Sequence, residues 1–295
     1  MEKGGCGCAD GGIRNIKMAY EFRPMRSMIF TDVAKEEYRH KLLKWHMLHV
    51  EDSIAQFQPY VTKYSFYQAL PLPPDSEPFG PAKFHLCEHY WLMDPMKPEF
   101  VNKAFSEVMP VEVLKWQGSV PDEAQEEKAN MDGDVFRATS GKKGGRPFVF
   151  GFHPICWEED LKGKERTIED GANYRFIFMV QYPHGIPEEE GEKWIHEEVL
   201  AKFTEMPEVT RILTSHILQD VNNCAYHRVV EMWFEGPEEW HEACVVKAKN
   251  IRKPSFAQTD TFPYLIPQFH IASIFVTDIP YSDNMTQYRG YIAKR

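Results

Sequence analysis

The order of predicted strands and helices, which occurs twice, constrains the fold of this chain more than any other feature. In the first half, aromatic and β-branched runs predict strands, and apolar residues at helical spacing predict helices. The strands are expected at 25–33, 60–70, 83–93 and 111–120, and the helices at 34–56 and 98–109. The resulting order, β-α-β-β-α-β, is that of a ferredoxin-like unit.

The second half repeats this order without obvious repetition of the residues themselves. Strands are expected at 173–182, 209–221, 225–235 and 269–279, and helices at 187–205 and 237–251. The helix at 187–205 opens with Glu188, Glu189 and Glu190, and acidic side chains suit the positive end of a helix dipole. The repeat is therefore one of pattern.

We accordingly expect an α+β fold in which two tandem ferredoxin-like (βαββαβ) units pack as an α+β barrel-like body, with a cavity between sheet and helices. The expected divisions are a mobile N-terminal tail (1–19), a first unit with the active-site cavity (20–117), a polar Gly-rich segment (118–147), and a second unit with a C-terminal extension (148–295). Segments as long as 118–147 are usually lids or linkers, and pattern alone leaves both open; we assign it as a lid loop.

Charge and hydropathy exclude several classes of partner. Lys and Arg number 34 against 44 Asp and Glu, and the net charge of −10 without a basic cluster disfavours nucleic acid. No apolar run approaches the roughly 20 residues of a membrane helix, and the N-terminus has no apolar signal-peptide core, so we expect a cytoplasmic protein without membrane contact. Cys6 and Cys8 form a C-x-C in the Gly-rich tail, which is half a metal site at most.

The strand at 83–93 carries a His-x-Cys-x-His row. Alternation places His85, Cys87, His89 and Trp91 on one face. Such a row contains zinc or copper ligands, but residues four apart on a strand are about 13 Å apart, too far to share one ion. We therefore expect no metal here.

His46 and His49 are three positions apart near the end of the first expected helix, and so lie on neighbouring parts of its surface. Such a pair could ligate a metal or haem, or each could be an ordinary packed or surface histidine. His49 has the more suggestive context, because Glu51, Asp52 and Ser53 follow it where a helix can break beside a cavity.

Aromatic residues are abundant on the two strands that follow this helix. They could line a site for a planar ligand or fill an ordinary core. The set comprises Tyr60, Tyr64, Phe66, Tyr67, Tyr90 and Trp91. The sequence contains no G-x-G-x-x-G or Walker motif and no nucleophile elbow, so we predict no nucleotide site.

Several longer strings resemble the bacterial chalcone isomerase family, and they run from about residue 20 to the C-terminus. The strings are Phe22-Arg-Pro-Met-Arg-Ser, Asp52-Ser-Ile-Ala-Gln-Phe-Gln-Pro-Tyr, Glu88-His-Tyr-Trp-Leu, Trp116-Gln-Gly, Leu161-Lys-Gly-Lys-Glu-Arg-Thr-Ile-Glu-Asp-Gly-Ala-Asn-Tyr-Arg-Phe, Glu190-Gly-Glu-Lys-Trp and Tyr288-Arg-Gly-Tyr-Ile.

The resemblance implies a cofactor-free, homo-oligomeric enzyme that interconverts chalcones and flavanones. It implies that His49 is the catalytic acid/base and that Gln117 lies at the ligand site. We assign substrate binding to Gln117, Tyr64, Trp91, Tyr90 and Asp94; Asp94 is a candidate carboxylate partner of His49 in a segment that departs from the family pattern. The expected partner is a small aromatic flavonoid.

Two alternatives remain open at this point. One acid/base histidine also serves a related isomerase or racemase acting on flavonoids. A barrel of this architecture could instead bind haem or another small molecule without isomerase activity.

Overall fold

The structure is a computed structural model, and it describes residues 25–33, 39, 40, 43, 46, 50, 61–91, 148–150, 153–155, 159–163, 174–217 and 226–283. Several predictions lie outside these residues: the tail with Cys6 and Cys8, the helix at 98–109, the strand at 111–120, the lid at 118–147, and the site residues His49, Asp94 and Gln117.

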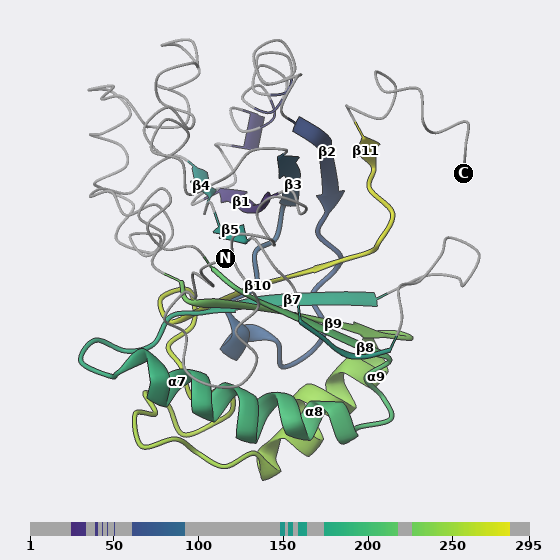
Figure 1. Cartoon of the computed structure of the whole chain (residues 1–295). Helices are drawn as coiled ribbons and strands as arrows, with labels where there is room; N and C mark the ends of the chain where they lie inside the picture. Colours follow the sequence, from purple (N-terminus) through teal and green to yellow (C-terminus); the bar gives the residue numbers. More distant parts are fainter. Residues whose placement is uncertain are drawn as a thin grey trace, which may run out of the picture.

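The second unit has the predicted ferredoxin-like topology. Its strands are β7 (Tyr174–Val180), β8 (Arg211–His216), β9 (Arg228–Phe234) and β10 (Ile271–Val276), and β6 (Glu159–Lys162) adds an edge. The sheet order is β10-β7-β9-β8-β6 with antiparallel pairing throughout (Figure 1). Numbered within the unit, its four main strands therefore lie in the order fourth, first, third, second.

Two helical segments cover one face of this sheet (Figure 1). The first comprises α7 (Glu188–Trp194), a π-helical stretch η4 (Ile195–Leu200) and α8 (Ala201–Glu205). The second comprises α9 (Pro237–His241), η5 (Glu242–Val246) and η6 (Lys247–Asn250). Their apolar stripes and the facing strands form a closed aromatic core that includes Phe176, Phe178, Phe203, Phe234, Trp240 and Phe275.

The first unit repeats three of these strand positions. β1 (Met25–Val33), β2 (Val61–Gln68) and β3 (His85–Trp91) lie in the order β2-β3-β1, which matches β8-β9-β7 of the second unit. β1 also pairs with β4 (Phe148–Phe150) and β5 (His153–Ile155), and β2 with β11 (Ser282–Asp283). The range predicted as the second unit, 148–295, therefore includes three short strands that pair with the sheet of the first unit instead.

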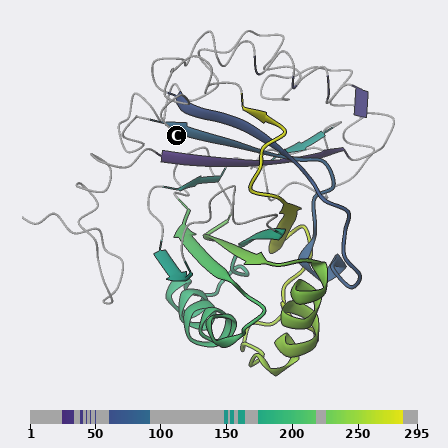
Figure 2. The same ribbon diagram turned by 90° about the vertical axis from the view of Figure 1, so that its right-hand side faces the viewer.

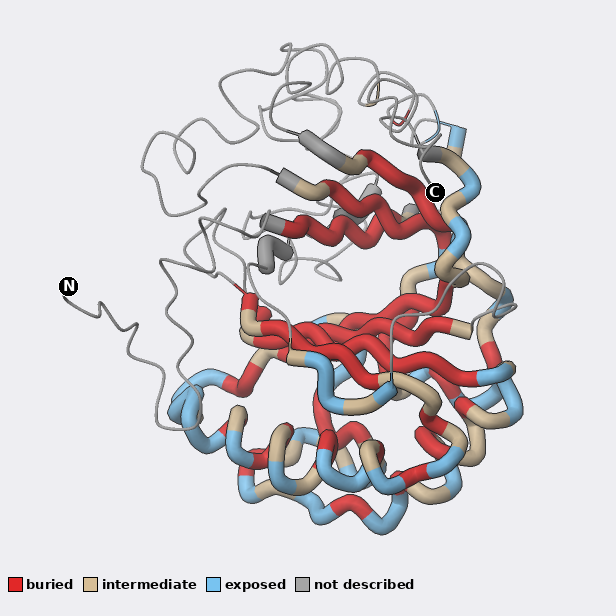
Figure 3. The backbone as a smooth tube through the Cα atoms, turned by 45° about the vertical axis from the view of Figure 1, so that its right-hand side comes forward, coloured by how far each residue is buried: buried red, intermediate tan, exposed pale blue. Residues whose placement is uncertain are grey.

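The two sheets pack face to face, with the helices of the second unit on the far side (Figure 2). Alternate residues of each strand point into this interface, where Met28, Phe30 and Leu86 of the first sheet meet Ile177 and Ile274 of the second. The strands of both sheets are buried over most of their length, whereas the helices expose their outer surfaces (Figure 3). This confirms the expected α+β barrel-like body.

Each unit also sends a segment across to the other. The connection between β2 and β3 includes a 3₁₀ turn, η2 (Glu77–Phe79), and its Ala82 N–H donates to Ser273 O at 2.7 Å on β10. Phe79 inserts into the core of the second unit, with its ring 5.3 Å from that of Phe176. In return, the chain after β10 crosses to the first sheet and ends there as β11.

Within the described part of the chain, none of the helices combines the length and apolar composition that crossing a bilayer would require.

Candidate functional site

The outer face of β3, turned away from the second sheet, carries the His-x-Cys-x-His row. β3 pairs with β1 on one side and β2 on the other, so its side chains lie at the centre of the described sheet. His85, Cys87 and His89 are each 6% exposed or less. The predicted placement of this row on one face is therefore confirmed.

Helical residues stack on this face. Arg39, His40, Leu43, His46 and Val50 are helical, as expected for 34–56. The His46 ring is buried, and its centroid lies 4.9 Å from that of His85 and 4.8 Å from that of Phe66. Phe84 lies between these elements, 4.0 Å from the His85 ring. Two imidazoles are thus held together by aromatic packing between a sheet and a helix.

Tyr64, Cys87 and His89 form a second group further along the same face. The Tyr64 ring stacks on the His89 ring at 4.2 Å with an interplanar angle of 11°. Cys87 Sγ lies 3.3 Å from His89 Nε2, so thiol and imidazole share a hydrogen bond. Tyr64 is 1% exposed, which places a phenol, a thiol and an imidazole together in a buried environment.

Burial sets the protonation of this face. Desolvation, with a smaller contribution from the positive charge of Arg39, lowers the pKa of His85 to about 4. Desolvation and the nearby Glu88 carboxylate raise the pKa of Cys87 well above its ordinary value, although a hydrogen bond from Tyr64 acts in the opposite direction. At neutral pH, His85 is therefore an uncharged imidazole and Cys87 a thiol, which can accept and donate single protons.

The corresponding face of the second unit is mostly apolar. β9 occupies the place of β3, and it turns Val230 and Met232 toward its helices where β3 has Cys87 and His89. Arg228, at the position of His85, is buried and forms an ion pair with Glu192 of α7 at 2.6 Å. Because a structural core needs few titratable groups, the cluster of imidazole, phenol and thiol side chains on the first unit marks it as the candidate site.

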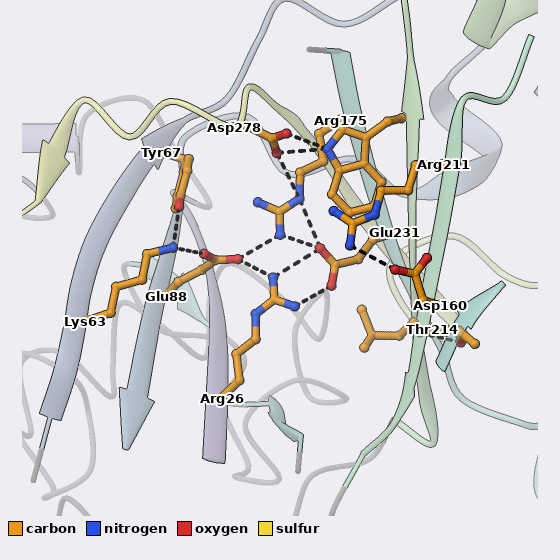
Figure 4. A network of polar contacts seen from close by, with 12 residues as sticks. Arg26, Lys63, Tyr67, Glu88, Asp160, Arg175, Arg211, Thr214, Glu231 and Asp278 are labelled. Atoms are coloured by element: carbon orange, nitrogen blue, oxygen red, sulfur yellow. Dashed lines mark hydrogen bonds and ion pairs between the residues drawn. The ribbon is translucent and has the colours of Figure 1, made fainter. Parts of the chain in front are cut away.

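The inner faces of the two sheets meet in a closed ring of four buried charges (Figure 4). Arg26 on β1 donates to Glu88 on β3 at 2.5 Å and to Glu231 on β9 at 2.5 Å. Arg175 on β7 donates to Glu88 at 2.8 Å and, through Nε, to Glu231 at 3.0 Å. Each cation thus touches both anions.

This ring reveals an internal two-fold pattern. Arg26 is the second residue of β1 and Arg175 the second of β7; Glu88 is the fourth residue of β3 and Glu231 the fourth of β9. Residue patterning along the chain missed this repeat. The detectable signal was a glutamate followed at the second and third positions by aromatics in both central strands, Glu88-His-Tyr-Trp and Glu231-Met-Trp-Phe.

Two of the predicted substrate residues lie on opposite faces of the first sheet. Tyr90 lies on the inner face, where Arg26 and Lys63 approach its ring to 5.8 and 5.1 Å. Tyr64 lies on the outer face with His89, so the structure places Tyr90 on the opposite face of the sheet from Tyr64. Trp91 occupies a strand position of the same parity as His89 and pairs with Met25 and Val61.

Among the residues that the structure describes, no three His, Cys, Asp or Glu side chains converge as a metal site.

Strand order, sheet packing and the ring together define a tandem ferredoxin-like protein whose first unit carries a buried imidazole, phenol and thiol surface. Residues 22–122 match the family described as "Chalcone isomerase N-terminal domain", a segment that includes β1, β2 and β3. The match covers about a third of the 295 residues and supports a chalcone isomerase-like first unit. No curated protein sequence matches the chain.

Two of the solved structures that resemble this chain align with it over most of its length. An anthrone oxidase-like protein has 10% identity and a TM-score of 0.45, with 90% of this chain and 94% of that chain covered. Chlorite dismutase from Candidatus Nitrospira defluvii, in complex with imidazole, has 10% identity and a TM-score of 0.39, with coverage of 90% and 94%. The fold assignment rests on strand order and sheet packing rather than on these likenesses.

Proposed function

We propose that this protein is a chalcone isomerase-like enzyme acting on flavonoids, with its site on the outer face of the first sheet. The observation that carries the proposal is the buried imidazole, phenol and thiol surface of β2 and β3. The equivalent face of the second unit has a mostly apolar core with one buried ion pair, Arg228–Glu192. The family match over residues 22–122 adds the reaction class, and it spans His49, Asp94 and Gln117.

The reaction is an intramolecular addition that needs proton transfers and no redox partner. In cyclisation, the 2'-hydroxyl of a chalcone loses a proton and its oxygen adds to the β-carbon of the enone. The negative charge passes to the ketone oxygen as an enolate, and the α-carbon then takes up a proton. We assign these transfers to His49, because an imidazole titrates near neutral pH and can both accept and donate.

Other residues of the site would hold the substrate and stabilise the enolate. Tyr64 and Gln117 are the proposed hydrogen-bond donors to the developing oxygen anion. The neutral His85 beside His46 offers a further donor or acceptor without adding a positive charge. Trp91 and Asp94 remain proposed substrate contacts, and 118–147 a proposed lid that follows Gln117. Assembly as a homo-oligomer is likewise a proposal.

The test compares His49→Ala with His40→Ala in a chalcone–flavanone assay followed by absorbance. His40 is an exposed helical residue within the range predicted as the first helix, 34–56, so its replacement controls for nonspecific effects of losing a histidine there. Loss of one general acid/base should lower the rate about 10²–10⁴-fold, while the melting temperature stays unchanged. Near wild-type turnover in His49→Ala would refute the assignment, and the absence of turnover in the wild-type protein would refute the function.

A further inference from the structure

The segment that follows the last strand of the second unit reaches the candidate site of the first. After β10 ends at Val276, the Asp278 carboxylate accepts a bifurcated hydrogen bond from the Trp233 Nε1–H, with Nε1 at 2.7 and 2.9 Å from its two oxygens. The Tyr281 N–H then donates to Phe66 O at 3.0 Å, and β11 pairs with β2. This segment, Thr277–Tyr281, is therefore fixed at one end on the second sheet and at the other on the first.

Its last side chain, Tyr281, joins the rings of the site. The Tyr281 ring centroid lies 5.1 Å from that of His85 and 6.2 Å from that of Phe66. His85, Phe66 and the neighbouring His46 are each 6% exposed or less, whereas Tyr281 is 55% exposed. Of the described rings in this cluster, Tyr281 is thus the one that reaches solvent.

A half-exposed tyrosine held by its backbone is suited to ligand contact. A Tyr ring provides apolar area at a low entropy cost, and its hydroxyl adds a hydrogen bond. Burial of part of the ring, and the nearby Cys87, raise the pKa of Tyr281 to about 12, so the hydroxyl remains a donor at neutral pH. A planar aromatic ligand with hydroxyl or carbonyl groups matches both properties.

We propose that Tyr281 is a ligand-binding residue of the candidate site, forming its solvent-facing aromatic contact for planar phenolic substrates. This inference rests on the proposed function for the substrate class. It adds that the second unit completes the site of the first through the Thr277–Tyr281 segment. Tyr281 acts in binding, so its removal should raise KM and leave kcat largely unchanged.

The test uses Tyr281→Ala, Tyr281→Phe and the control Ile279→Ala. Ile279 belongs to the same segment and is also 55% exposed, so the control matches Tyr281 in location and exposure. Binding of the flavanone naringenin and of an anilinonaphthalene sulfonate probe is measured by calorimetry and fluorescence, together with melting temperatures and isomerisation kinetics.

Tyr281→Ala should weaken naringenin binding about three- to tenfold, the effect of one aromatic contact, while Ile279→Ala binds as the wild type. Tyr281→Phe should retain most of the affinity. If the wild-type protein binds naringenin without isomerising chalcones, and Tyr281→Ala still weakens binding, the inference stands and the isomerase function falls. Wild-type binding by Tyr281→Ala overturns the inference alone, and a wild-type protein that binds neither probe overturns both.

Discussion

Arg26 and Glu231 are 205 positions apart in the sequence and belong to opposite sheets, yet two hydrogen bonds of 2.5 and 3.1 Å join their side chains. The second pair of the ring, Arg175 and Glu88, crosses the interface in the reverse direction at 2.8 Å. Because each arginine also donates to the glutamate of the other pair, the four buried side chains form one network, and each sheet positions the charges of the other. The ring therefore fixes how the first sheet is positioned on the second.

Removing one charge from this ring should destabilise the whole body. Glu231 is 1% exposed and accepts from both Arg26 and Arg175, so Glu231→Gln leaves two buried guanidinium groups short of negative charge. We expect a loss of about 3–5 kcal/mol in the free energy of unfolding, measured by urea denaturation. The control is Glu205→Gln, at a side chain that is 73% exposed. Equal stability of the two variants would contradict a structural role for the ring.

Acid should weaken the same interface. Burial alone would raise the pKa of Glu88, but Arg26, Lys63 and Arg175 hold it well below the ordinary 4.5. The unfolded chain therefore takes up a proton first, and the stabilisation that is complete above pH 4.5 is lost as the pH falls toward the depressed pKa. Burial would likewise raise the pKa of Glu231, but Arg26 and Arg175 hold it below its ordinary value. Glu231→Gln removes that second titrating carboxyl, so urea midpoints between pH 5 and pH 3 should fall less steeply in this variant than in the wild type.

A separate loss of stability should occur at higher pH, because of His85. Its pKa is about 4 in the folded protein against an ordinary 6.5, so the unfolded chain binds a proton that the folded protein refuses. Stability should thus decrease as the pH falls from 6.5 to 4. His85→Phe should flatten this part of the profile. Besides burial, the positive charge of Arg39 lowers the pKa of His85, and Arg39→Gln removes that charge. The pKa of His85 should rise toward its ordinary value, so the variant should lose less stability between pH 6.5 and pH 5 than the wild type. An unchanged profile in His85→Phe would contradict the assignment.

A small substitution in the second unit should be unusually costly. A Cβ at Gly191 of α7 would lie well inside contact distance of the Tyr182 ring, which is itself buried. Alanine normally favours a helix over glycine, yet here the clash should dominate and lower the unfolding free energy by about 1–3 kcal/mol. Glu189→Ala, in the same helix turn, is the control. Melting temperatures of both variants test this, and a Gly191→Ala variant that melts at or above the wild-type temperature would contradict the predicted clash.

Much of the fold was accessible from residue patterning because long apolar strands and helices carry strong periodic signals. The strand predicted at 25–33 coincides with β1, and the helices predicted at 187–205 and 237–251 coincide with the two helical segments of the second unit. Strands of two or three residues, such as β4, β5 and β11, are too short to show a periodic pattern in the sequence.

The candidate site was predicted only in part. Alternation correctly placed His85, Cys87 and His89 together, since two-residue periodicity is a local property. It could not show that Tyr281, nearly two hundred positions later in the chain, packs on His85. Charged residues within strands normally indicate a solvent-facing position. The sequence therefore could not predict the buried ion pair of Arg26 and Glu231, which forms only because the two sheets pack face to face.

The two crossing segments make the halves of this protein mutually dependent. The first unit supplies Phe79 to the hydrophobic core of the second, and the second supplies β11 to the sheet edge of the first. A gene fragment ending between the units would yield a half with an unfilled hole and a half with an unprotected strand edge. Such halves would be poor candidates for separate expression, but good ones for complementation, in which two inactive fragments regain structure when they meet.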